Sequence, residues 1–293
     1  LIALQHHDVE IEIKIREVKD CLQLVNYSDP VSAEEGRELN KESIRIVPPD
    51  STYSGIGGQS PLEDVRLDCN YVLLDTEDRC RIAQMDHEIL ITQTQKIVQN
   101  VNNSKSVNLT FNHPVKEMFW YIQNTHIKNQ PDPFNFSTGY KDLMDKDIYD
   151  YLNAQNKKHQ EYYRFHNNKG HWLDEARITI NGHPIIDWKD WKYFYFLQNY
   201  ENYRNKLEHN VYLYSFTGNP KSKTPMGSLN FSRLEEAQLQ IKINEENRTK
   251  FKSIRQSDKQ YKGDDESLTI NVYAINYNYL VIKGGVASLL FEC

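Results

Sequence analysis

Hydrophobic and polar residues alternate most regularly near the end of the chain. Leu268, Ile270, Val272 and Ala274 are each separated from the next by a single residue. Because successive side chains of a β-strand point to opposite faces, this period predicts a strand over residues 268–275 with these four side chains on one buried face. We expect the Asn-Tyr-Asn stretch at 276–278 to interrupt it. A strand at 279–282, a break at the glycine pair 284–285 and a last strand at 286–291 should follow.

The same alternation recurs along most of the chain. Val9, Ile11, Ile13 and Ile15 alternate with charged residues, which predicts a half-buried strand. Further strands are expected at residues 65–74, 87–95, 107–111, 115–122, 177–186, 211–216 and 239–243, with a turn at Asn181–Gly182. Residues 75–83 differ, because acidic residues open the segment and arginines follow, and they predict a short connecting helix.

Two segments depart from this rhythm. Residues 124–175 are rich in Asn, Asp, Lys and Tyr and are long for a connection between strands, so we expect a surface loop with short helices. The second segment is a dense aromatic cluster made of Trp188, Trp191, Tyr193, Phe194, Tyr195 and Phe196. Alternation within 193–197 favours a core strand and its flank, while a contact between subunits or a platform that stacks sugar rings stay open as alternatives.

Many short strands, with helices only in the connections, predict an all-β protein built as a sandwich or barrel. The residues from 89 onward suffice for one eight-stranded jelly roll with an elaborated loop. The net charge of -6 argues against a nucleic-acid surface, which would need a basic stripe. The four cysteines form no CxxC pair and are expected to be free thiols.

No motif predicts catalysis, a metal or a cofactor. The histidines include no HExxH pair, and the adjacent His6 and His7 would point to opposite faces of a strand. The glycines at 55–58 lack the spacing of a nucleotide-binding loop, the GxSxG elbow is missing, and the acidic residues 264–266 lie in a polar loop. We therefore expect no enzymatic activity and no cofactor.

Asn230, Phe231, Ser232 and Arg233 are the candidate fold-corner or assembly residues. In the favoured interpretation Asn230 and Ser232 satisfy backbone groups at a corner while Phe231 packs inward. In the alternative, Arg233 contacts another subunit, because its guanidinium donates several hydrogen bonds in a fixed fork.

Several of these blocks together resemble the major capsid proteins of nucleocytoplasmic large DNA viruses, the double jelly-roll family. The matching stretches are LIALQHHDV at residues 1–9, NYVLLDT at 70–76, RCRIAQ at 79–84, HEILI at 87–91, FNHPVKE at 111–117, YSF at 214–216, GSLNFSR at 227–233, VYAINYN at 272–278 and GGVASLLF at 284–291. They follow the family's order over nearly the whole chain. The chain departs from the family pattern at His6, Cys80 and Val286, where Tyr, Arg and Met are usual.

The resemblance implies that residues 1–75 are the C-terminal remnant of a first jelly roll, 76–88 an interdomain connector and 89–293 a complete second roll. The chain starts at Leu1 rather than at a methionine, and we expect its N-terminal part to be missing. The family assembles as homotrimers with pseudo-hexagonal outlines that tile an icosahedral shell. The implied partners are neighbouring capsomers, minor capsid proteins and an internal membrane, with no direct contact to nucleic acid. The implied location is the virion capsid, after synthesis in the host cytoplasm, with the 124–175 loop on the outer face.

Two other functions fit a jelly roll. A carbohydrate-binding module would use the aromatic cluster to stack sugars. A hydrolase on the same scaffold is disfavoured, because no pair of nucleophile and base can be named in the sequence.

Overall fold

The computed structural model describes residues 2–14, 66–102, 104–124, 136–137, 170–204, 209–249 and 268–291, together with the backbone of the paired strands β1 (Leu24–Tyr27) and β2 (Ile44–Val47). Most of the 124–175 loop, the glycines at 55–58 and the acidic residues 264–266 lie outside these ranges.

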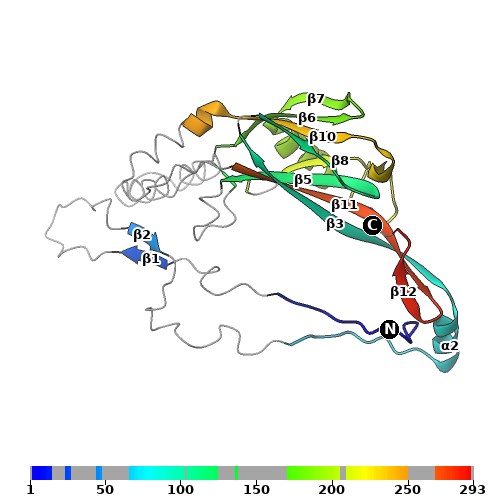
Figure 1. Ribbon diagram of the computed structural model, residues 1–293. Coiled ribbons are helices and arrows are strands. Elements are labelled where there is room, and N and C mark those ends of the chain that lie inside the picture. Colours follow the sequence, from blue (N-terminus) through cyan, green and yellow to red (C-terminus); the bar gives the residue numbers. More distant parts are fainter. Residues whose placement is uncertain are drawn as a thin grey trace.

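Two antiparallel sheets form the body of the molecule (Figure 1). One has the order β4-β10-β6-β7. The other has the order β12-β11-β5-β8, with β3 also paired to β11 and β9 to β5. The strands are β3 (His87–Val101), β4 (Ser104–Asn108), β5 (Pro114–Asn124), β6 (Leu173–Ile180), β7 (His183–Asp190), β8 (Tyr212–Ser215), β9 (Leu229–Asn230), β10 (Ala237–Ile243), β11 (Leu268–Lys283) and β12 (Val286–Leu289).

The pairing is nested, as if one long hairpin were wound around the core. The outermost strands β3 and β11 pair with each other, then β4 with β10, β5 with β8, and β6 with β7 innermost. Strands of successive pairs lie in opposite sheets, so each sheet takes four of these strands. This is the winding of an eight-stranded jelly roll, and the all-β expectation is confirmed.

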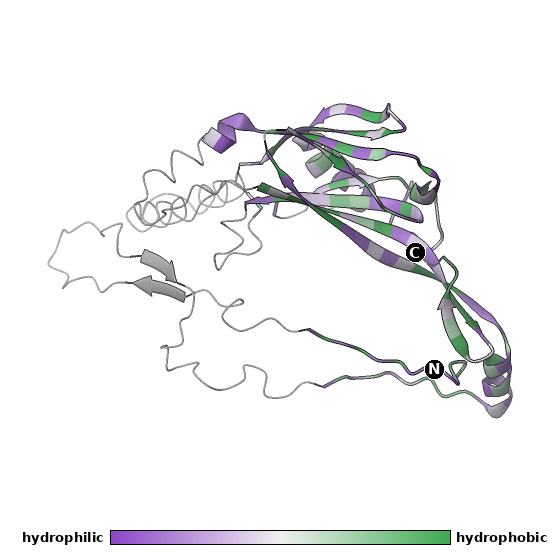
Figure 2. Cartoon of the chain, in the orientation of Figure 1, coloured by the Kyte–Doolittle hydropathy of each residue, from purple (hydrophilic) through white to green (hydrophobic). Residues whose placement is uncertain are grey.

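The core lies between the two sheets and follows the period-two pattern. Leu268, Ile270, Val272 and Ala274 of β11 are all buried, as their spacing predicts. Leu239 and Ile241 of β10 oppose them from the other sheet within the same cluster. Along the strands, hydrophobic and hydrophilic positions alternate visibly (Figure 2). The alternation therefore predicts the buried face correctly in a segment that pairs with neighbouring strands of a sheet.

The turn predicted at Asn181–Gly182 is present between β6 and β7. Both residues have positive φ, 48° and 79°. A two-residue turn with positive φ at both positions matches the twist of the flanking strands, which explains the Asn-Gly sequence. The connecting helix is also present as α2 (Thr76–Gln84), with Glu77 and Asp78 in its first turn.

Two expected strands are wrong. The described parts of 9–15 and 65–74 have no regular secondary structure, and their large apolar side chains are exposed, with Leu73 at 94%. A strand needs a neighbour that accepts its backbone hydrogen bonds. Within the described residues, no strand pairs with either segment. Residues 9–14 do alternate between apolar and charged side chains, but within the described residues they join no sheet.

The expected interruption at 276–278 is also wrong, because β11 continues unbroken from Leu268 to Lys283. Its pairing with β5 shifts register between Ile275 and Asn276, while its pairing with β3 stays regular from residue 268 to 282. The asparagine side chains are buried and hydrogen-bonded sideways to β3, through Gln95 to Asn276 and through Gln93 to Asn278. The strand therefore passes the polar residues instead of stopping at them.

The core strand expected at 193–197 is a helix. A helical segment begins directly after β7 and includes the π-helix η2 (Tyr193–Leu197) and α6 (Gln198–Tyr203). Asp190 Oδ1 accepts the backbone N–H of Lys192 at 2.9 Å, which satisfies one of the N–H groups left open at a helix start. The buried side chains are Phe194, Tyr195, Gln198 and Asn199, a helical spacing rather than an alternating one.

Candidate functional site

The four residues Asn230–Arg233 lie where β9 leads into the short 3-10 helix η3 (Phe231–Arg233). Asn230 Oδ1 accepts the backbone N–H of Ser232 at 3.1 Å. Ser232 Oγ accepts the backbone N–H of His113 at 2.8 Å, and the His113 carbonyl accepts the N–H of Phe231 at 3.1 Å. These bonds tie the corner to the start of β5, across more than a hundred residues of sequence.

Phe231 packs into the core from this corner. Its ring meets Phe111 and Phe216 edge-on, each with centroids 5.8 Å apart. Arg233 is exposed. The side chains of Asn230, Phe231 and Ser232 therefore hold the corner, and Arg233 is the charged group that the corner presents to the surface.

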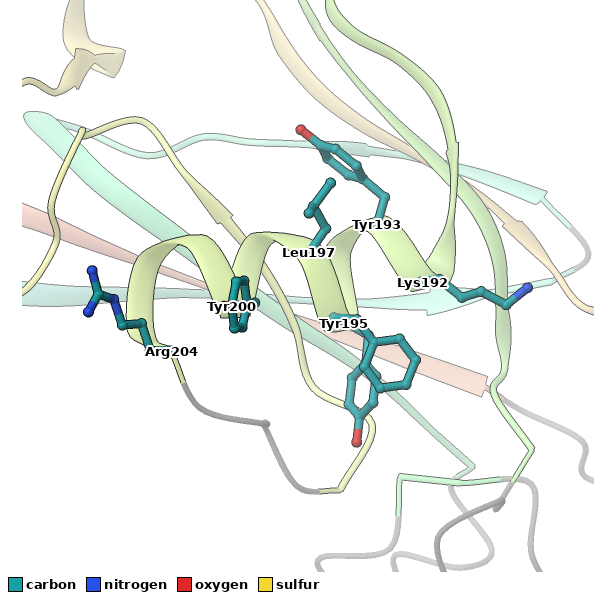
Figure 3. A pocket seen from close by; sticks show the side chains of 7 residues that line it. Lys192, Tyr193, Tyr195, Leu197, Tyr200 and Arg204 are labelled. Atoms are coloured by element: carbon teal, nitrogen blue, oxygen red, sulfur yellow. The ribbon is translucent and has the colours of Figure 1, made fainter.

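An apolar groove of about 640 Å³ lies along the helical segment after β7 (Figure 3). It is lined by Lys192, Tyr193, Tyr195, Phe196, Leu197, Tyr200 and Arg204. Tyr200, Phe196 and Leu197 are 69%, 48% and 45% exposed. Lys192 and Arg204 stand at opposite ends of the segment (Figure 3). The arrangement offers aromatic and aliphatic surface between two cations, which suits contact with another molecule.

The inner side of the same segment closes the core. Phe194 meets Trp120 of β5 edge-on at 5.1 Å, and Tyr212 of β8 lies 6.0 Å from Trp120. His171 stacks on Trp191 with centroids 3.5 Å apart, and its Nδ1 lies 3.0 Å from the Tyr212 hydroxyl. The cluster that alternation assigned to a strand is thus divided by a helix into a buried and an exposed half.

His171 makes the folded protein sensitive to acid. Burial lowers the pKa of His171 to about 4, and the nearby carboxylate of Asp190 offsets only part of that effect. The unfolded chain takes up this proton near pH 6.5 and the folded chain only near pH 4. Stability from this group is therefore fully present above pH 6.5 and is lost as the pH falls toward 4. Between pH 7.5 and 5 we expect a loss of about 2 kcal/mol in the free energy of unfolding.

Urea denaturation at the two pH values measures this loss. A His171→Phe variant should show a pH dependence smaller by about that amount. The matched control is His183→Phe on the exposed hairpin, which should keep the parental dependence. An unchanged dependence in His171→Phe would contradict the assignment.

A second buried group fastens the end of α6 to the sheet. Glu117 of β5 accepts a hydrogen bond from the Tyr203 hydroxyl and forms an ion pair with Lys116 Nζ at 3.4 Å. Lys116 Nζ also donates to the Pro220 carbonyl at 3.1 Å, and Lys221 Nζ donates to the Tyr203 carbonyl at 2.7 Å. Burial raises the pKa of the Tyr203 hydroxyl above its ordinary value, and the hydrogen bond to Glu117 raises it further. These groups are bonded to each other, which is typical of a structural network.

Asn278 closes the end of the chain onto β11 and β3. Its Nδ2 donates to Gln93 Oε1 at 2.8 Å and to the Phe291 carbonyl at 2.9 Å. Its Oδ1 accepts the backbone N–H groups of Tyr279 at 2.8 Å and Phe291 at 3.1 Å. The side chain uses both its donors and its acceptor, which explains an asparagine at a fully buried position.

In the part of the chain that the structure describes, no three His, Cys, Asp or Glu side chains are placed to hold a metal ion. Cys69 and Cys80 are exposed free thiols. None of the described helices combines the length and the apolar character of a membrane span.

Comparison with known proteins identifies one family. The family model described as the large eukaryotic DNA virus major capsid protein matches residues 78–288. Curated relatives named "Major capsid protein" include that of Paramecium bursaria Chlorella virus 1, 27% identical over 315 residues, which cover 99% of this chain and 62% of the relative. The relative from Phaeocystis pouchetii virus is 23% identical over 356 residues, with 100% and 62% covered. The chain therefore spans about three fifths of the length of these relatives.

Solved structures show the same fold. The quasi-atomic model of the PBCV-1 virus capsid superposes with a TM-score of 0.53 at 24% identity, over 76% of this chain and 56% of the other. The crystal structure of the PBCV-1 capsid protein VP54, fitted into a reconstruction of the virophage Sputnik, gives 0.54 with the same identity and coverage.

Proposed function

This chain belongs to the family of major capsid proteins of large eukaryotic DNA viruses, and from that premise we propose that it is a structural subunit of a viral shell. The subunit assembles as trimeric, pseudo-hexagonal capsomers that tile an icosahedral surface. The observation that carries the proposal is the family match over residues 78–288, which includes all the paired strands of the nested roll from β3 to β11. The resemblance drawn from the short sequence blocks is confirmed by that match.

The geometry supports a role in shape rather than in chemistry. Two buried titratable groups, Glu117 and His171, are bonded to or stacked on neighbouring side chains of the fold. The connections between the strands carry exposed groups that other chains can contact, such as Tyr200 of α6 and Arg233 of η3. A rigid sandwich with variable loops is the design that jelly rolls supply to shells.

The proposal includes two rolls in the subunit. Residues 1–75 are assigned to the end of a first roll, 76–88 to the connector and 89–293 to the second roll. The exposed apolar residues of 8–14 and 66–74 support this assignment. Val9, Ile11 and Ile13 alternate with charged residues, Tyr71–Leu73 form an apolar run, and no strand of the described residues pairs with either segment. Their burial against further strands would remove them from water.

The proposal also includes partners outside the trimer. Neighbouring capsomers contact the flanks of the subunit, and minor capsid proteins and an internal membrane lie beneath the shell. Synthesis takes place in the host cytoplasm before the protein enters the virion. The net charge of -6 supports the absence of direct contact with nucleic acid, whose phosphates would be repelled.

The mass of the purified protein tests the assembly step. The protein should be expressed with any coding sequence that precedes Leu1. We expect light scattering after size-exclusion chromatography to give the mass of a trimer, because subunits of a shell bury about 2,000–5,000 Å² in obligate contacts. Negative-stain images should show particles with a pseudo-hexagonal outline. A monomer at micromolar concentration, with no larger species at higher concentration, would overturn the proposal.

A carbohydrate-binding module is the second candidate, and one observation favours it. Tyr200 and Phe196 expose ring surface beside a groove that also presents Lys192 and Arg204. Exposed rings of this kind can stack on the faces of sugars. If the monomeric protein binds glycans on an array and Tyr200→Ala abolishes that binding, this candidate is favoured. Trimers that bind no glycan would favour the shell subunit.

A further inference from the structure

The β11–β12 hairpin contacts a short segment from the other end of the chain. The backbone N–H of His6 donates to the Gly285 carbonyl at 3.0 Å. The backbone N–H of Ala287 donates to His7 Nδ1 at 3.3 Å. Ala3, which precedes these residues, is buried. The N-terminus and β12 lie side by side far from the sandwich (Figure 1), so residues 3–7 reach the roll through this turn.

The two glycines of the turn are not equivalent. Both have left-handed backbone conformations, with φ of +58° at Gly284 and +80° at Gly285. A Cβ on Gly284 would meet nothing within 4 Å, whereas one on Gly285 would lie 3.1 Å from Gln5 Cβ and 3.1 Å from His6 Cδ2. Backbone conformation alone explains a glycine at either position. Only at Gly285 does the segment lie so close that an added Cβ would have to displace it by a few tenths of an ångström.

The hairpin is itself fixed to the sandwich, so the segment is held in a defined place. Residues 278–282 of β11 pair with 87–91 of β3 on one side, and residues 280–283 pair with β12 on the other. Beyond β12, the Leu290 N–H donates to the Tyr279 carbonyl at 2.9 Å and Asn278 binds Phe291. Since β12 lies at the end of its sheet, its outer backbone edge can receive another segment, and residues 6 and 7 use it.

We propose that the Gly284–Gly285 turn is the docking site for residues 3–7 and that Gly285 is the position that admits them. The contact fixes the direction in which the chain enters the roll. It rests on the proposed two-roll subunit, in which it sets the orientation of the first roll relative to the second. The kind of partner that the turn accepts is a short segment with a side-chain acceptor one residue after its docked N–H, the role that His7 fills.

A pair of alanine substitutions tests the docking site. Gly285→Ala introduces the overlap with Gln5 and His6, while Gly284→Ala introduces the same left-handed strain without it. Hydrogen exchange of the His6 and Ala287 amides, in the full chain, reports the two docking bonds. We expect exchange at both amides to rise by at least about tenfold more in Gly285→Ala than in Gly284→Ala, because overlap in a packed contact opens it.

Removing the opposing atom provides a rescue. Gln5→Gly takes away the Cβ that the new methyl group would meet, so Gly285→Ala combined with Gln5→Gly should regain part of the protection. Should Gly285→Ala fold poorly, His7→Ala removes the acceptor for Ala287 at an exposed position and should raise exchange at Ala287 by itself. Equal exchange in the two glycine variants, or unchanged protection of Ala287 in His7→Ala, would overturn the docking site.

The outcome is separable from that of the proposed function. Trimer mass in the parental protein tests the shell subunit, and amide exchange tests the turn. A trimeric parent whose Gly285→Ala variant keeps full protection would refute the docking site alone. A monomeric parent whose variant loses protection would refute the shell subunit and leave the docking site standing.

Discussion

Replacing Trp120 with alanine is expected to lower the free energy of unfolding by about 3–5 kcal/mol, the usual cost of removing a large aromatic side chain from a core. Trp120 is fully buried in β5, the strand that pairs with β11 on one side and β8 on the other. Its ring contacts Phe194 of the helical segment and Tyr212 of β8. The substitution therefore leaves a cavity where the sheet and the helix meet.

Urea denaturation measures the loss, and two variants bracket it. Trp120→Phe should cost only about 1–2 kcal/mol, because it leaves a smaller cavity and because the indole N–H finds no acceptor among the described residues. Phe196→Ala truncates an aromatic residue of the same segment on its exposed side and should change stability by no more than about 0.5 kcal/mol. A loss below about 1 kcal/mol in Trp120→Ala would contradict the described core.

Replacing Asn278 with leucine should cost about 2–4 kcal/mol, although the two side chains are similar in size. The change leaves the N–H and carbonyl of Phe291 and the amide of Gln93 without the partners they have now. The four hydrogen bonds that Asn278 makes are partly buried, and each contributes about 0.5–1.5 kcal/mol. Phe291 should also detach, since its two bonds to β11 run through this side chain, whereas Leu290 keeps its bond to the Tyr279 carbonyl.

Thermal denaturation measures the stability change, and limited proteolysis measures release of the residues around Phe291. The matched control is Asn100→Leu at an exposed position of β3, which should stay within about 0.5 kcal/mol of the parent. A stable Asn278→Leu protein with an uncleaved C-terminal end would show that the clamp does not hold that end in place.

The strand expected over residues 193–197 failed because its sequence shows no contrast between faces. In 193–197 every residue is large and apolar or aromatic, so an alternating pattern carries no contrast between a wet and a dry face. The signal that could have shown the helix is the spacing of Phe194, Tyr195, Gln198 and Asn199, which includes two polar residues that sequence reasoning does not assign to a core. Asp190 before the segment is the capping residue that supports the same interpretation.

Some parts of the candidate sites could be predicted from the sequence and others could not. The corner residues Asn230–Arg233 could be singled out because asparagine and serine commonly satisfy backbone groups at turns. Their partner His113 could not, since it lies more than a hundred residues away in the chain. The groove along α6 was missed because the helix was missed. The docking of residues 3–7 was missed because Gly285 reads as an ordinary turn glycine until its neighbour is known.

By itself the sequence determined which strands have one buried face and where the Asn181–Gly182 turn lies, because these depend on spacing within a few residues. It also identified the family, because the matching blocks follow the family's order along nearly the whole chain. Only the tertiary structure decided whether a strand-like segment becomes a strand. Residues 268–283 run unbroken past two asparagines because β3 supplies partners for their amides, whereas residues 8–14 alternate equally well and stay unpaired. Backbone and amide hydrogen bonds need a neighbour, and local pattern does not say which distant segment provides it.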